Sequence, residues 1–161
     1  MPRVTPLNID ENSFFRILGY LPQVAAGWQA LDKEMRFGGS LDPELKEQVR
    51  RSMAPGVGCE FCATLGGPPA DQLDQKVAVG IAYAQALIAD HRELDDSMFV
   101  VLREEFTEAE IVELTIWICF ITAGQMFGSI MDVGPATDSD VEAFHTGLAE
   151  SAREHAAATG R

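Results

Sequence analysis

The sequence is poor in basic residues. Its 161 residues include 12 lysines and arginines against 25 aspartates and glutamates, which leaves a formal net charge of −13. Nucleic acids and anionic membranes are bound through basic faces, and a chain this acidic is a poor partner for either. We therefore expect no nucleic-acid partner and no membrane partner.

Targeting signals are lacking as well. The opening stretch MPRVTPLNID has no apolar core of the signal-peptide kind. The longest apolar run, residues 111–131, is close to the length of about 20 residues that a membrane span needs. This run contains Glu113 and Gln125 and continues a capped helix, so we interpret it as the buried central helix of a cytoplasmic protein.

Strand signals are scarce, whereas helix signals recur. No long alternating run of β-branched residues and no Asn-Gly hairpin occurs. Helix caps, Gly-Gly and Pro-Gly breaks and apolar periodicity predict an all-α fold of about six to seven helices. The expected helices cover residues 21–37, 42–54, 58–65, 71–89, 93–106, 107–131 and 139–157. We expect residues 1–161 to form one domain, in which 136–161 is a polar C-terminal helix that lies on the surface or packs on a neighbouring subunit.

Several side chains are interpreted as packing residues. Val24, Trp28, Leu31 and Met35 share one face of the helix at 21–37. The other large aromatic side chains at helical spacing are interpreted as core rather than as the lining of a pocket, and Cys119 is expected to be a buried core residue. The aromatic residues concerned, with Trp28, are Tyr83, Trp117 and Phe120.

Cysteine is infrequent, yet two of the three cysteines stand close together as Cys59-Glu-Phe-Cys62. An odd number of cysteines disfavours a secreted disulfide framework, and a lone Cys-x-x-Cys in a reducing compartment indicates redox or metal chemistry. A helical Cys-x-x-Cys sets the sulfurs about one turn apart, within reach of a disulfide. If Cys59 lies in the first turn, free N–H groups and the helix dipole favour its thiolate, while Glu60 opposes it. Cys62 then lies one turn deeper and is less exposed.

Three interpretations of the pair compete. A redox pair is favoured. Zinc is disfavoured because it requires four ligands, and Cys119 and the three histidines show no paired ligand spacing. Two inert buried cysteines are the remaining alternative. The sequence does not say which thiol of a redox pair attacks and which resolves.

Glu47 precedes Cys59 by 12 residues on the preceding predicted helix. Two consecutive helices joined by APGVG can fold back, so this carboxylate could approach the thiol as a general base or proton relay. Alternatively, Glu47 forms a solvated helix ion pair with Arg50 and Arg51, three and four residues further on. Spacing alone favours the ion pair.

The stretch LDPELKEQVRRSMAPGVGCEFC resembles the motif of the carboxymuconolactone decarboxylase and alkylhydroperoxidase D (AhpD) superfamily. That motif reads Glu, eleven residues, Cys-x-x-Cys, three residues, His. The opening stretch and the regions at 21–47 and 106–134 also resemble the family, so the resemblance covers roughly residues 1–135. It implies an AhpD-like helical subunit that forms a homo-oligomer, a trimer or hexamer. It further implies Cys59 and Cys62 as the redox pair and Glu47 as the relay carboxylate.

The sequence departs from this family pattern at several positions. Gly66 stands where the motif histidine is expected, and Phe61 lies between the cysteines where some members have histidine. The helix that normally follows the motif is missing, because only ATLGGPPADQL separates Cys62 from Asp74. Thr122 and Gln125 replace asparagines that are common in the long closing helix.

The missing imidazole has a chemical consequence. Glycine cannot shuttle a proton, so a relay must use Glu47, water or a residue from elsewhere. His91 is the nearest candidate in sequence, and its position at a helix end is also an ordinary one for a histidine. His145 and His155 are expected to be solvent-exposed on the polar final helix.

Three functions follow from these observations. The first is an enzyme, a thiol-dependent peroxidase or disulfide oxidoreductase that acts on a hydroperoxide, is restored by an external dithiol reductant and needs no bound cofactor or metal. The alternative is a non-redox enzyme acting on a small organic acid or lactone, which has lost the peroxidase relay. The third is an assembly or binding protein whose polar tail, residues 138–160, serves as an oligomer arm.

Overall fold

The computed structural model describes residues 1–159. This part of the chain consists of helices and contains no strand, which confirms the all-α prediction. The eight α-helices and one 3-10 helix are α1 (Phe15–Leu18), α2 (Pro22–Phe37), α3 (Pro43–Val57), α4 (Glu60–Gly66), α5 (Gln75–Asp90), η1 (His91–Glu93), α6 (Asp96–Glu105), α7 (Glu108–Ile130) and α8 (Asp138–Thr159). The count exceeds the predicted six to seven because α1 and η1 have only four and three residues, too few to show a periodic pattern.

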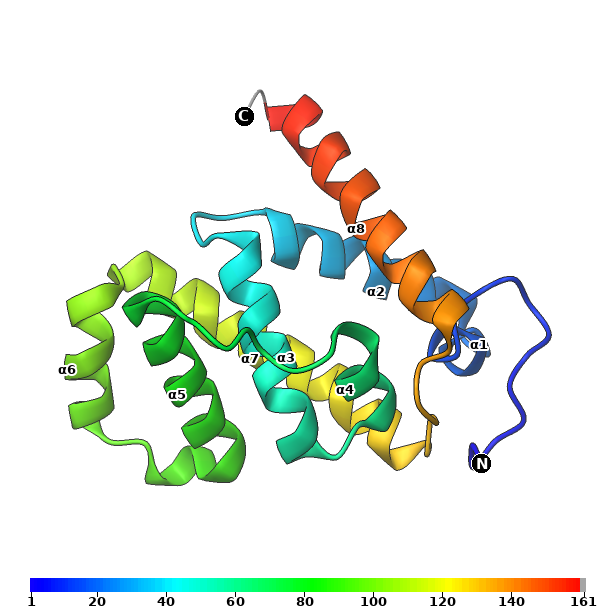
Figure 1. Cartoon of the computed structure of the whole chain (residues 1–161), viewed down its shortest axis with the longest axis horizontal. Coiled ribbons are helices and arrows are strands. Elements are labelled where there is room, and N and C mark those ends of the chain that lie inside the picture. Colours follow the sequence, from blue (N-terminus) through cyan, green and yellow to red (C-terminus); the bar gives the residue numbers. More distant parts are fainter. Residues whose placement is uncertain (160–161) are drawn as a thin grey trace.

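Helix α7 is the central helix, as predicted. It runs behind the other elements across the molecule (Figure 1) and packs on α3, α4, α5 and α6. Leu114, Trp117 and Ile118 are fully buried, and the indole Nε1 of Trp117 donates to the Lys46 carbonyl oxygen at 2.9 Å. Within residues 1–159, α7 is also the one helix long and apolar enough to cross a membrane, a property that it shares with core helices of soluble proteins.

The opposite side of α7 carries an uncovered apolar stripe, which we call the outer stripe. Its residues are spaced alternately by four and three positions: Val112, Ile116, Cys119, Ala123, Met126 and Ile130. The prediction that Cys119 is buried is wrong, because the neighbouring helices cover only one side of α7. The predicted apolar face of α2 is likewise only partly covered, since Val24 and Leu31 are exposed.

A buried lysine pins the turn between α2 and α3. Lys46 is fully buried, and its Nζ donates to the carbonyl oxygens of Met35 and Gly38, both at 2.8 Å. It also forms an ion pair of 2.7 Å with Glu113 on α7, whose carboxylate accepts hydrogen bonds from the backbone of residues 40 and 41. The C-terminal end of α2 is therefore held beside α3, which brings Arg36 next to Glu47.

Several helix boundaries differ from the predicted ones. Helix α3 continues through Pro55 to Val57, because Gly58 adopts a left-handed conformation (φ 78°) and caps the helix there. Helix α5 begins later than expected, after the N-cap Asp74. Helix α8 begins one residue before the predicted start at 139, and Thr137 and Asp140 cap it, since the backbone N–H of each bonds to the side chain of the other.

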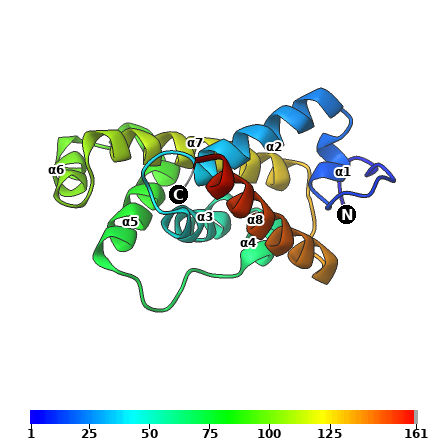
Figure 2. The same cartoon turned by 90° about the horizontal axis from the view of Figure 1, so that it is seen from above.

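Helix α8 lies over α2 and α4 (Figures 1 and 2). The segment that leads into it is tied to α4 by the Ala136 N–H, which donates to the Thr64 hydroxyl at 2.7 Å. Further along, Glu154 pairs with Lys33 on α2. The C-terminal helix thus contacts its own subunit, and its contact with a neighbouring subunit stays a prediction.

Candidate active site

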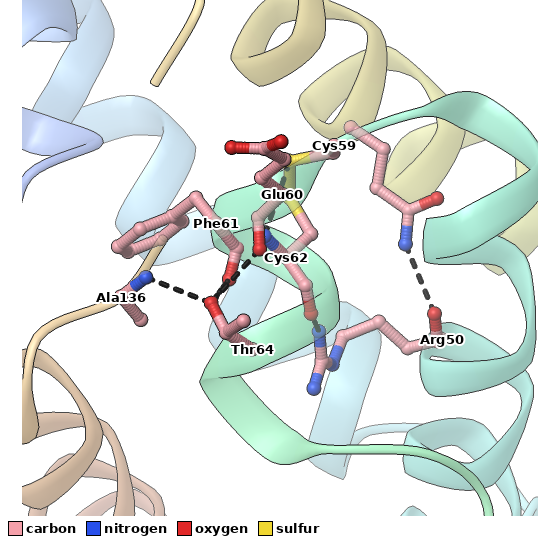
Figure 3. Close-up of a disulfide and its surroundings, with 8 residues drawn as sticks. Arg50, Cys59, Glu60, Phe61, Cys62, Thr64 and Ala136 are labelled. Carbon is pink, nitrogen blue, oxygen red and sulfur yellow. Dashed lines mark hydrogen bonds between the residues drawn. A yellow bond between two sulfur atoms is a disulfide. The ribbon is translucent and has the colours of Figure 1, made fainter. Parts of the chain in front are cut away.

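The two cysteines of the motif are bonded to each other as a disulfide at the start of α4 (Figure 3). Their Cα atoms are 5.2 Å apart. Cys59 is the N-cap residue, and its Sγ accepts a hydrogen bond from the Cys62 N–H at 3.2 Å. The helix therefore begins at Glu60 instead of near Gly58, since the left-handed Gly58 turns the chain between α3 and α4. Cys59 lies where a helix favours a negative charge, as the sequence predicts.

The predicted order of burial of the two cysteines is wrong. Cys59 is 1% exposed and Cys62 is 9% exposed, so Cys59 is the deeper residue. Helix α7 covers Cys59 at Gly128, where an added Cβ would lie 2.7 Å from the Cys59 Sγ and 3.7 Å from the Cys62 Sγ. The absence of a side chain at Gly128 therefore lets the disulfide pack directly against α7.

Cys62 lies in the wall of a cavity of about 540 Å³ between α2, α4, α7, α8 and the segment around α1. Seven of the 24 residues in this wall are aromatic, namely Phe14, Phe15, Trp28, Phe37, Phe61, Phe120 and Phe144. Trp28 and Phe120 therefore line a pocket, whereas Tyr83 and Trp117 belong to the core as expected. A cavity of this size and character accommodates a largely apolar small molecule beside the Cys62 side chain.

A buried amide adds a polar group to the cavity wall. Gln125 is 2% exposed, and its Nε2 donates to the Arg50 carbonyl oxygen at 2.9 Å. Its Oε1 is buried without a hydrogen-bond partner in the described part of the chain. Buried polar atoms are nearly always paired, so this oxygen is an exception within the described residues. Thr122, the other residue that departs from the family's asparagines, bonds to the Ile118 carbonyl oxygen and does not line the cavity.

Glu47 lies at the centre of a cluster of three arginines. Its Oε2 accepts from Arg36 Nη1 at 2.9 Å and from Arg50 Nε at 2.8 Å. Its Oε1 accepts from Arg50 Nη2 at 2.7 Å and from Arg51 Nε at 2.9 Å. The predicted ion pairs with Arg50 and Arg51 therefore exist, but the Arg50 pair is buried and the Arg51 pair is partly buried. Sequence reasoning missed Arg36, which has no diagnostic spacing and approaches from the end of α2.

The cluster determines the charge state of Glu47. Burial raises the pKa of this carboxyl group, but hydrogen bonds and positive charge from Arg50, Arg36 and Arg51 outweigh it and lower the pKa to about 2. Glu47 is therefore ionised at neutral pH and holds protons weakly. A general base is most effective when its pKa lies near the working pH, a condition that Glu47 does not meet in this arrangement.

Gly66 lies directly on this cluster. A Cβ at Gly66 would lie 2.5 Å from Arg50 Nη2, 2.9 Å from Glu47 Oε1 and 3.0 Å from Arg51 Nε. The same Arg50 donates from Nη1 to the Cys62 carbonyl oxygen at 3.1 Å (Figure 3). Guanidinium groups thus fill the space beside the position where the family motif has an imidazole, and Arg50 links Glu47 to Cys62.

The histidines lie outside the cavity wall. His91 lies in η1, which packs on α5, and is exposed. His145 is exposed as expected, whereas His155 is half-buried, with its ring 6.3 Å from that of Phe37. The cavity wall, as far as residues 1–159 form it, contains no histidine. Nor do His, Cys, Asp and Glu side chains gather within that range in a group of three that could hold a metal ion.

Comparisons with known proteins agree with this architecture. No family model matches the sequence, and no curated protein matches it. Among solved structures, an uncharacterized peroxidase-related protein from Silicibacter sp. TM1040 superposes with a TM-score of 0.70 and 15% identity, over 81% of this chain and 78% of that one. A second, described as an alkylhydroperoxidase AhpD core from Ralstonia eutropha JMP134, has a TM-score of 0.70 and 16% identity, over 81% and 79% of the two chains. The chain therefore has the helical fold of the alkylhydroperoxidase AhpD core.

Proposed function

We propose that this chain is a thiol-dependent peroxidase that reduces an organic hydroperoxide with Cys62 and Cys59. The observation that carries the proposal is the position of the disulfide-forming pair, whose more exposed member, Cys62, lies in the wall of an aromatic cavity. The peroxidase-related descriptions of the structural neighbours are consistent with it. Cys59 and Cys62 are the proposed redox pair. Glu47, whose carboxylate holds Arg50 beside Cys62, is the third proposed site residue.

The proposed reaction proceeds in three balanced steps. The Cys62 thiolate attacks the terminal oxygen of the hydroperoxide, the O–O bond breaks, and the leaving alkoxide takes up a proton to become an alcohol. The Cys59 thiol then attacks the sulfur of the Cys62 sulfenic acid, which forms the disulfide and releases water. An external dithiol reduces this disulfide back to two thiols and is itself oxidised to a disulfide. We place this cycle in the cytoplasm, where dithiol reductants are maintained.

The thiol state of the protein tests the proposal directly. Reduced protein treated with one equivalent of cumene hydroperoxide is expected to lose the mass of two hydrogen atoms, and a dithiol is expected to restore the original mass. Intact mass spectrometry before and after each addition makes this measurement. An unreactive Cys59–Cys62 pair would exclude the peroxidase cycle. It would favour the second candidate, a non-redox reaction on a small organic acid, which the large cavity and the missing imidazole would permit.

The unpartnered Gln125 Oε1 is proposed to accept the O–H of the bound hydroperoxide. Gln125→Met, which keeps the side-chain length, is expected to lower kcat/KM for cumene hydroperoxide about 5- to 10-fold, because one hydrogen bond is worth about 1 kcal/mol. Steady-state kinetics measures this effect. Thr122→Val on the same helix is the control, since Thr122 bonds only within α7 and lies outside the wall. Equal rates for wild type and Gln125→Met would remove Gln125 from the substrate site.

The outer stripe of α7 supports the proposed homo-oligomer. Its alternating spacing of four and three residues is the heptad pattern by which one helix packs against a like helix of another chain. Ile116→Lys is expected to shift the protein to monomers, measured by sedimentation, because a lysine ammonium placed in an apolar seam must be desolvated. Val100→Lys on α6 is the control, since Val100 is similarly exposed but lies away from the stripe. A wild-type protein that sediments as a monomer would contradict the proposal.

A further inference from the structure

We infer that Arg50 takes over the place of the missing imidazole: it is a positioning residue that holds the Cys62 backbone and supplies a fixed positive charge at the cavity wall. The inference rests on the proposed thiol chemistry of Cys62. It is carried by two observations, the contact of Arg50 with the Cys62 carbonyl group and the occupation of the space beside Gly66.

Position 66 has no room for a side chain. The Cβ of any residue at position 66 would come within 2.5 Å of Arg50 Nη2, a distance that real side chains do not tolerate. Arg50 cannot simply swing away, because Glu47 binds its Nε and Nη2 and the Cys62 carbonyl oxygen binds its Nη1. The ring centre of Phe144 also lies 5.3 Å from the guanidinium carbon of Arg50. Gly66 and Arg50 are therefore a matched pair, in which the guanidinium group excludes an imidazole.

Arg50 also restrains the position of the Cys62 thiol. Arg50 is 5% exposed and lines the same cavity as Cys62. Its hydrogen bond to the Cys62 carbonyl oxygen joins α4 to the buried ion cluster on α3. Since α4 has only seven residues, this charge-assisted contact is a major restraint on where the Cys62 side chain lies.

Several charged groups lie near Cys62. Arg36, Arg50 and Arg51 face Glu47 and Asp32, so three positive charges meet two negative ones. Lys33 on α2 and Glu154 on α8 also line the cavity, and their opposite charges cancel because they form an ion pair. Helix α7 contributes only uncharged residues to the wall, and Glu60 on α4 is exposed to solvent. Of the three guanidinium groups, it is that of Arg50 that bonds to Cys62, so its positive charge is the one that favours the thiolate form of Cys62.

A guanidinium differs from an imidazole in one measurable respect. It stays protonated at every pH at which the protein is folded, so it stabilises a negative charge without passing a proton. The reactivity of Cys62 should then rise with pH along a single limb, that of the thiol itself. The proton lost by the thiol goes to water, and water returns one to the alkoxide.

The test measures the alkylation of Cys62 by iodoacetamide between pH 5 and 10 in the reduced Cys59→Ser protein, followed by mass spectrometry. Arg50→Gln is expected to move the midpoint of this profile upward by about one pH unit or more, because it removes the nearby opposite charge. Arg50→Lys keeps the positive charge and should therefore show a smaller upward shift than Arg50→Gln. Arg51→Gln is the matched control, since Arg51 also binds Glu47 but does not line this cavity. Arg51→Gln should change the midpoint by less than about 0.3 pH unit from that of the parent protein, well below the shift that the loss of a nearby charge produces.

The outcomes separate this inference from the peroxidase proposal, because alkylation requires no hydroperoxide. An upward shift confined to Arg50→Gln supports the inference even if hydroperoxide is not consumed. Equal shifts in Arg50→Gln and Arg51→Gln, or no shift in either, would overturn it. If Arg50→Gln does not fold, Arg50→Lys is measured in its place. A second titration between pH 5 and 8 in the profile of the Cys59→Ser protein with Arg50 intact would also overturn it.

Discussion

Cys62→Ser is expected to reduce hydroperoxide turnover to the background rate, a loss of about 10³-fold or more, because a serine hydroxyl is not ionised near neutral pH and is a far weaker nucleophile than a thiolate. The measurement is the consumption of cumene hydroperoxide with dithiothreitol as the reductant. Cys119→Ser is the control, since Cys119 is exposed on the outer side of α7 and does not line the cavity. It should retain wild-type turnover.

Cys59→Ser is expected to fail at a different step. Cys62 should still react once and remain as a sulfenic acid, because no second thiol is left to form the disulfide. Dimedone labelling of Cys62 detects this intermediate, and multiple turnover should fall to a slow rate that depends on direct attack by dithiothreitol. Normal turnover by Cys59→Ser would end the two-thiol mechanism. If dimedone labelled Cys59 in the converse Cys62→Ser protein and did not label Cys62 in Cys59→Ser, the two roles would be reversed.

Glu47→Ala is expected to destabilise the fold by about 3–5 kcal/mol, because it removes the carboxylate that pairs with buried arginines and leaves their charges uncompensated. For a chain of this size the melting temperature should fall by about 10 °C. Thermal unfolding followed by circular dichroism measures it. Glu60→Ala is the control, since Glu60 is exposed beside the same disulfide and should change stability by less than about 0.5 kcal/mol. Equal melting temperatures for the two variants would show that the ion cluster contributes nothing to the fold.

The low pKa of Glu47 also predicts how stability changes with pH. Its pKa is about 2 in the folded chain, against an ordinary value of 4.5. The unfolded chain therefore takes up this proton first as the pH falls. The corresponding stabilisation, roughly 3 kcal/mol, is fully present above about pH 5 and is lost as the pH falls from there toward 2. Denaturation of wild type and Glu47→Gln across this range isolates the effect, because other paired carboxylates contribute equally to both proteins. Parallel curves would contradict the low pKa.

Much of the local structure could be predicted from the sequence, because it depends on neighbours along the chain. Asp42 and Thr107 cap the helices where the sequence places them, since a capping side chain bonds to backbone only two or three residues away. Cys59 and Cys62 meet because a spacing of three brings side chains together at any helix start. The ion pairs of Glu47 with Arg50 and Arg51 follow from the same rule.

The sequence by itself thus determined an all-α chain, a thiol pair within bonding distance and an acidic residue one helix away. Only the tertiary structure decided that Glu47 is buried, that Arg36 completes its cluster, and that Cys62 instead of Cys59 faces the cavity. These features arise where α2, α7 and α8 pack against α3 and α4. The free energy of such contacts depends on which surfaces exclude water together, and no spacing along one helix encodes that.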